Sequence, residues 1–176
     1  MKLLVVRHAL AEDRVAFAAT GATDALRPLT VRGTERFALA AKGIARVAPT
    51  LELIASSRLL RAVQTAEAIF AECGADDTAL VDELDPSAPP EAVERWLSKR
   101  EARRACIVGH EPNLGLFVSW LLGAGDGEEC VRLGKGSACL VELHGKPSPG
   151  AGQLLWLLDE KHLRDLGRVR RGKTGP

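Results

Sequence analysis

Short apolar runs alternate with longer amphipathic segments through the first two thirds of the chain. The runs occupy residues 3–6, 53–55, 79–81 and 105–108. Each run is too short for a helix and is rich in branched or small apolar residues, which is typical of a strand buried on both faces. A segment long enough for a helix separates each run from the next. This alternation predicts an α/β sheet.

Apolar residues at three- and four-residue spacing predict helices between these strands. The clearest stripe covers residues 59–73, and Gly74 is placed to end it. Similar stripes cover residues 37–47, 93–97 and 114–121. Each of these helices would lay its apolar face on the sheet.

The last third of the chain has a different pattern. Residues 138–143 and 154–158 are strand-like, and the segment 144–153 between them contains the Gly and Pro residues of a hairpin loop. An antiparallel pair is therefore expected to close the sheet, within one domain over residues 1–167. Residues 168–176 are basic and lack apolar spacing, which predicts a frayed tail rather than a nucleic-acid arm.

Composition supports a single globular domain and excludes several other classes. The 176 residues are 46% hydrophobic and 27% charged, with 24 basic and 23 acidic side chains. This balance gives no electrostatic field that would attract nucleic acid. The apolar start runs directly into Arg7 and His8, so it has neither a signal peptide's cleavage region nor the length of a membrane span. A cytoplasmic location is expected, with no membrane partner.

The four cysteines predict neither a disulfide nor a zinc framework. Cys73, Cys106, Cys130 and Cys139 form no C-x-x-C pair and lie in apolar surroundings, which favours buried thiols.

The candidate catalytic and binding residues lie where the predicted strands end. Arg7-His8 follows the first strand, Gly109-His110 follows the fourth, and Arg61 lies in the opening turn of the best-defined helix, just past the second. In an open α/β sheet, ligands bind outside the carboxyl ends of the strands. If these strands are neighbours, two imidazoles and several guanidinium groups face one spot beside helix N-termini, which predicts an anion site.

A histidine among such cations points to reaction as well as binding. A neutral imidazole can attack phosphorus when a hydrogen bond at one ring nitrogen aims the other. Neighbouring arginines disfavour the imidazolium of His8 and stabilise phosphoryl oxygens during transfer. Each residue alone has a plainer explanation: a strand-end histidine is often only hydrogen-bonded, and Arg61 lies on its helix's polar side. Arg58, one turn earlier, competes for the same role.

Four motifs occur in order along the chain and together resemble the histidine phosphatase superfamily, most closely its SixA type of phosphohistidine phosphatase. They are Arg7-His8-Ala9, Arg27-Pro28-Leu29-Thr30 followed by Gly33, Ser57-x-x-x-Arg61-Ala62-x-Gln64-Thr65-Ala66, and Gly109-His110-Glu111-Pro112-Asn113.

This resemblance implies a phosphoglycerate mutase-like, three-layer α/β/α fold, no metal, no cofactor and a phosphohistidine intermediate on His8. It implies that Arg7 and Arg61 bind phosphate and that His110 holds phosphate oxygens. Arg27 either reaches the pocket rim or anchors the turn before a helix capped by Thr30.

Two further residues are candidates of less defined role. Arg58 replaces the family's usual proline and would add charge at the rim of the site. Glu83 lies just past the third predicted strand, a position that resembles the superfamily's proton-donor region. It is either that donor or a loop carboxylate that orients an arginine.

The expected function is hydrolysis of phosphohistidine on a protein of the histidine-phosphotransfer type. A site with few candidate proton donors favours such a labile substrate, because the imidazole of phosphohistidine leaves readily once its ring is protonated. One alternative keeps the mechanism and takes a small phosphate ester. Another is a noncatalytic module that binds phosphorylated partners.

Overall fold

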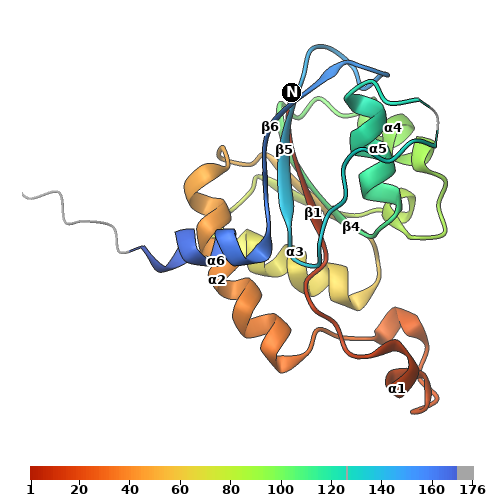
Figure 1. The fold of residues 1–176 in the computed structure, drawn as a ribbon, viewed down its shortest axis with the longest axis vertical. Coiled ribbons are helices and arrows are strands. Elements are labelled where there is room, and N and C mark those ends of the chain that lie inside the picture. Colours follow the sequence, from red (N-terminus) through yellow and green to blue (C-terminus); the bar gives the residue numbers. More distant parts are fainter. Residues whose placement is uncertain (126, 170–176) are drawn as a thin grey trace, which may run out of the picture.

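A single mixed sheet organises the part of the chain that the computed structural model describes, residues 1–125 and 127–169. Its six strands lie in the order β3-β2-β4-β1-β5-β6 (Figure 1). They are β1 (Lys2–Arg7), β2 (Leu53–Ser56), β3 (Asp77–Leu80), β4 (Arg104–Gly109), β5 (Ala138–Leu143) and β6 (Gly152–Leu158). The first four run parallel, whereas β5 is antiparallel to β1 and β6 is antiparallel to β5. The predicted sheet and its antiparallel C-terminal edge are confirmed.

Helices cover both faces of the sheet (Figure 1). One face packs against α2 (Val31–Val47), α3 (Leu60–Cys73) and α6 (Glu160–Arg168), and the other against α4 (Pro90–Leu97) and α5 (Asn113–Leu121). Alternate residues of β1 enter the two cores, with Leu3 and Val5 on the α4–α5 side and Leu4 and Val6 on the other. The architecture is the predicted three-layer α/β/α sandwich.

The structure departs from the predicted elements in a few places. α2 begins at Val31, ahead of the predicted stripe. Its cap is the expected one, because the Thr30 hydroxyl accepts a 2.8 Å hydrogen bond from the Gly33 amide. α1 (Arg14–Ala18) and the 3-10 turn η1 (Asp24–Leu26) have no buried residues and so carry no apolar stripe to reveal them. A second 3-10 turn, η2 (Asp82–Leu84), follows β3. Cys106 and Cys139 are buried, but Cys73 is only partly buried and Cys130 is exposed, so the prediction of four buried thiols is wrong for Cys130 and only partly met at Cys73.

The C-terminal end of the described chain is α6, which extends to Arg168. Residues 170–176 of the predicted tail lie outside the described residues. The domain boundary at residue 167 stays a prediction. No helix of the described chain is long and apolar enough to cross a bilayer.

Residues 10–30, here called the cap, leave the end of β1 and return to the start of α2, extending away from the sheet (Figure 1). Ala11 and Leu29 form an isolated antiparallel bridge that closes the base of the cap. The Thr30 amide donates to the Leu10 carbonyl at 3.0 Å. Gly33 makes this approach possible, since a Cβ there would lie 2.0 Å from the Leu10 oxygen. The chain just past His8 is thereby held against the first turn of α2.

We expect Gly33→Ala to lower the free energy of unfolding by about 1–3 kcal/mol, because the added methyl group must push the Leu10 backbone away from α2. Urea unfolding measures the loss. The neighbouring Arg32→Ala change, at an exposed position of the same turn, is the control and should stay within about 0.5 kcal/mol. Equal stability of the two variants would show that this contact does not hold the cap.

Candidate active site

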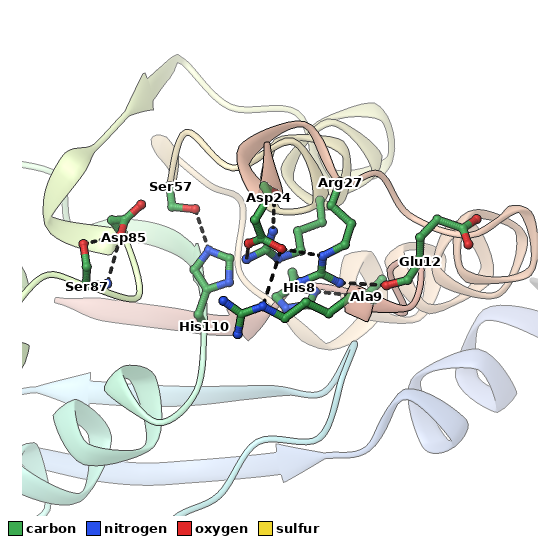
Figure 2. Close-up of polar contacts among 11 residues, drawn as sticks. His8, Ala9, Glu12, Asp24, Arg27, Ser57, Asp85, Ser87 and His110 are labelled. Carbon is green, nitrogen blue, oxygen red and sulfur yellow. Dashed lines mark hydrogen bonds and ion pairs between the residues drawn. The ribbon is translucent and has the colours of Figure 1, made fainter. Parts of the chain in front are cut away.

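The pairing of β1 with β4 brings two distant histidines together. Arg7 lies opposite Gly109 in the parallel register, so His8 and His110 follow adjacent strand ends. The His8 amide donates to the Gly109 carbonyl at 3.0 Å. The two ring centroids are 5.0 Å apart with their planes inclined by 52° (Figure 2). The predicted convergence of these two imidazoles therefore occurs in the structure.

His8 is aimed by its own backbone neighbour. Its Nδ1 lies 2.7 Å from the carbonyl oxygen of Ala9. Because a carbonyl can only accept, Nδ1 carries the proton, and Nε2 of the neutral ring keeps its lone pair. The side chain is only 6% exposed. Burial lowers the pKa of His8 to about 4; the Ala9 hydrogen bond acts to raise it, whereas the charges of Arg61 and Arg7 lower it further. His8 is thus a neutral base at physiological pH.

His110 is neutral for similar reasons. Burial lowers its pKa to about 3, with further lowering by His8 and Arg61. Its Nε2 shares a 2.7 Å hydrogen bond with the hydroxyl of Ser57, the residue that follows β2. Three strand ends therefore contribute to one spot: β1 through His8, β4 through His110 and β2 through Ser57.

Arg7 is fixed through the backbone of a late loop. Its Nη1 donates to the Leu133 carbonyl at 2.8 Å. The amide of the same Leu133 donates to the Glu111 carboxylate at 2.7 Å, and Glu111 also accepts from the Gly115 amide at 3.2 Å. Glu111 thus binds the amide of Leu133, and Arg7 binds its carbonyl. The Arg7 Nε is buried without a hydrogen-bond partner among the described residues.

Arg61 enters from α3 and is 4% exposed. Its Nη1 donates to the carbonyl of Asp24 at 3.1 Å, and its Nη2 lies 3.1 Å from the Asp24 carboxylate. Its Nε also has no partner in the described part of the chain. Thr65, one turn later on α3, accepts from the Ala9 amide at 3.1 Å and donates to the Arg61 carbonyl at 2.7 Å. The polar side of α3 therefore faces the site rather than solvent.

These groups line a cavity of about 730 Å³. The lining includes both histidines and five cationic side chains: Arg7, Arg14, Arg27, Arg61 and Lys135. Four acids also line it: Glu12, Asp13, Asp24 and Glu111. Buried guanidinium groups with unpartnered donors, beside two neutral imidazoles, can bind an anion and present a nucleophile to it.

The sequence-predicted residues fall into two groups. Arg7, His8, Arg27, Arg61 and His110 line this one cavity. Arg27 donates through Nε to Asp24 and through Nη1 to the Glu12 carbonyl, both at 2.8 Å, so it both reaches the pocket and anchors the cap.

Arg58 and Glu83 are not part of the cavity lining. Arg58 is more than half exposed, and its Nε pairs with Asp82 at 2.6 Å. Glu83 lies in η2, ahead of the loop that contributes Pro86 and Ser87 to the lining. Their roles in catalysis and binding stay predictions.

Sequence reasoning did not assign roles to several residues that hold this site. Ser57 and Glu111 lie within the recognised motifs, and their place in those motifs could have indicated that they belong to the site. Asp24 lies in a polar segment without periodicity, and nothing in the sequence connects it with Arg61. Asp85 accepts from the amide and hydroxyl of Ser87 at 2.9 and 2.6 Å, and its charge acts to raise the pKa of His110 (Figure 2).

Fold and pocket together define an α/β protein with a pocket of histidines and arginines at the strand ends. A sequence model described as the Histidine phosphatase superfamily (branch 1) matches residues 3–85. An uncharacterised protein of Picosynechococcus sp. (strain ATCC 27264 / PCC 7002 / PR-6) is 36% identical over 118 residues, which are 65% of this chain and 69% of that protein.

Solved structures share the fold. The protein histidine phosphatase SixA complexed with tungstate matches with a TM-score of 0.76 at 24% identity, covering 93% of this chain and 99% of that one. The alpha-ribazole phosphatase from Shigella flexneri matches with a TM-score of 0.67 at 17% identity, covering 91% and 97%. This chain belongs to the histidine phosphatase superfamily. Its fold is phosphoglycerate mutase-like. The family model gives its class of activity as that of a phosphatase, a hydrolase.

We expect the two buried histidines to make the fold sensitive to mild acid. Both have pKa values lowered from 6.5, His8 to about 4 and His110 to about 3. Between pH 6.5 and 4 the unfolded chain binds protons that the folded chain does not, so stability falls as the pH is lowered. Each histidine contributes a slope of up to about 1.4 kcal/mol per pH unit.

Urea unfolding at several pH values in this range measures that slope. His8→Gln and His110→Gln should each flatten it, because each removes one difference in proton uptake. His144→Gln, at an exposed position, is the control and should leave the slope unchanged. If all three variants keep the wild-type slope, the two histidines are not buried in their neutral form.

Proposed function

We propose that this protein is a phosphohistidine phosphatase that transfers a phosphoryl group to Nε2 of His8 and then hydrolyses the resulting intermediate. The observation that carries the proposal is the orientation of His8. The Ala9 carbonyl oxygen lies 2.7 Å from Nδ1 of His8 and keeps the proton on that nitrogen. The side chain is buried, and its ring is neutral. A neutral imidazole with one fixed nitrogen proton is a preoriented nucleophile.

The surrounding donors suit the charge that develops on a transferring phosphoryl group. Arg7 and Arg61 line the cavity, and each is tethered through a terminal nitrogen to a backbone carbonyl. His110 lies beside His8 and can hold a further phosphoryl oxygen. Such preorganised donors stabilise transfer without reorganising during the reaction.

The reaction has two steps, and water is the only reactant besides the phosphorylated substrate. Nε2 of His8 forms a bond to phosphorus while the bond from phosphorus to the substrate nitrogen breaks, and the departing imidazole keeps the proton that its ring has taken up. Water then attacks phosphorus and releases one proton to solvent, while the bond between phosphorus and His8 breaks, its electron pair returns to Nε2, and inorganic phosphate leaves. The Ala9 carbonyl supports the imidazolium character of His8 in both steps.

The acids of the pocket favour this labile substrate over an ester. The backbone amide of Ala16 lowers the pKa of Asp13, and Arg27 and Arg61 lower that of Asp24 against the effect of partial burial. Both carboxylates are therefore ionised and offer no proton to an alkoxide. Burial raises the pKa of Glu111, but its two oxygens already accept from the amides of Leu133 and Gly115. The imidazole of phosphohistidine needs no such donor once its ring is protonated. The proton-donor role of Glu83, the rim role of Arg58, the cytoplasmic location and the phosphotransfer-protein partner stay predictions.

A small phosphate monoester is the second candidate substrate. The cavity of about 730 Å³ has room for a metabolite beside the phosphoryl group. One structure that shares the fold carries the name alpha-ribazole phosphatase. A noncatalytic phosphoryl-binding module, the third candidate, would not need the aimed nucleophile.

Substrate preference separates these candidates. We expect catalytic efficiency on a histidine-phosphorylated phosphotransfer protein to exceed that on sugar and nucleotide monophosphates by about 100-fold, a transition-state difference of about 2.7 kcal/mol. His8→Ala should abolish turnover of every substrate, and His144→Gln should leave it unchanged. A clear preference for one metabolite would select the monoesterase. Equal loss of the phosphoryl group from the substrate protein with wild type and with His8→Ala would reject nucleophilic catalysis by His8.

A further inference from the structure

One carboxylate of the cap lies within a cluster of guanidinium groups beside the candidate nucleophile (Figure 2). Asp24, the first residue of η1, has its Oδ2 3.1 Å from Nη2 of Arg61 and its Oδ1 2.8 Å from Nε of Arg27. The Asp24 carbonyl accepts from Nη1 of Arg61 at 3.1 Å. A longer contact of 3.9 Å joins Oδ1 to the exposed Arg14.

These contacts connect two separate parts of the fold. Arg61 lies in the first turn of α3, in the body of the sandwich, whereas Asp24 and Arg27 belong to the cap. The side chain of Arg61 is 5% exposed, so it has few alternative positions. Asp24 contacts both of its terminal nitrogens and thereby fixes the plane of the guanidinium group.

The geometry leaves Arg61 with donors to spare. A guanidinium group has five N–H bonds, and Asp24 engages one on each terminal nitrogen. The remaining donors include Nε, which is buried and has no partner among the described residues. One edge of the group is therefore anchored, and Asp24 leaves the second N–H bond of each terminal nitrogen unoccupied.

We propose that Asp24 is the positioning residue of Arg61: it holds the guanidinium group in the orientation that binds the phosphoryl group in front of His8. An arginine has many rotamers, and a transition state gains most from donors that are fixed before reaction. The catalytic consequence rests on the function proposed above, whereas the effect on anion binding does not. Asp24 thus contributes to the site without contacting the nucleophile.

A different role for the same carboxylate predicts the opposite change in anion binding when Asp24 is neutralised. If Asp24 only competed with the ligand for the positive charge of Arg61, its neutralisation would tighten anion binding. If it positions Arg61, neutralisation weakens binding, and the effect requires Arg61. The direction of the change and its dependence on Arg61 therefore decide between the two roles.

A double-mutant cycle on tungstate binding, measured by titration calorimetry, tests this. We expect Asp24→Asn to weaken tungstate binding about fivefold and Arg61→Ala to weaken it about 30-fold, with the double variant within about twofold of Arg61→Ala. Asp13→Asn is the matched control, since it removes an equal charge from the same cavity but from a side chain that caps α1. It should stay within about twofold of wild type.

Two outcomes of the cycle overturn the proposal. One is unchanged or tighter binding by Asp24→Asn. The other is an equal weakening in the wild-type and Arg61→Ala backgrounds, which would indicate a general disturbance of the cap.

Steady-state kinetics on a histidine-phosphorylated protein gives a second readout. We expect Asp24→Asn to lower kcat about tenfold and to change KM by less than about threefold, because positioning matters most in the transition state. Asp24→Glu, which restores the carboxylate, should recover part of the loss. Absence of turnover by the wild-type protein would reject the proposed function, and the tungstate cycle would still decide the role of Asp24.

Discussion

The parallel pairing of β1 with β4 is the constraint on which the site depends. Its register sets Arg7 opposite Gly109, and the rings of the two following histidines then lie 5.0 Å apart. Two imidazolium groups at this distance, buried beside arginines, would repel each other and lack hydration, so both rings are neutral. Neutrality gives His8 a lone pair on Nε2. The strand pairing that buries the two rings beside the arginines therefore also keeps His8 in its nucleophilic form.

Strands and loops hold different parts of this pocket. The histidines are fixed by strand ends, which buried cores on both faces of the sheet make rigid. The arginines are fixed by contacts across loops: Arg7 through Leu133, and Arg61 through Asp24. Because α3 also contacts the Ala9 amide through Thr65, the backbone beside the nucleophile and Arg61 share one support. A shift of α3 would therefore disturb both Arg61 and the backbone beside His8, whereas a shift of Asp24 in the cap would act on Arg61.

Residue patterns predicted the parts of this fold that periodicity controls. The buried strands and amphipathic helices were recognisable, and so was the meeting of Arg7, His8, Arg61 and His110 at the strand ends, since parallel neighbours share that edge. The cap was not, because α1 and η1 bury no side chain and leave no periodic signal. The Asp24–Arg61 contact links residues on unrelated elements and depends on how the cap folds back. Likewise, proximity along the chain to a strand end did not bring Arg58 into the cavity.

The central claim is that His8 accepts the phosphoryl group covalently. Rapid-quench mixing of the enzyme with substrate carrying a radiolabelled phosphoryl group, followed by peptide mapping, tests it directly. We expect transient label on the peptide that contains His8, stable to base and released by acid, as a phosphorus–nitrogen bond requires. Turnover without any labelled enzyme, or with the label on His110, would contradict the account.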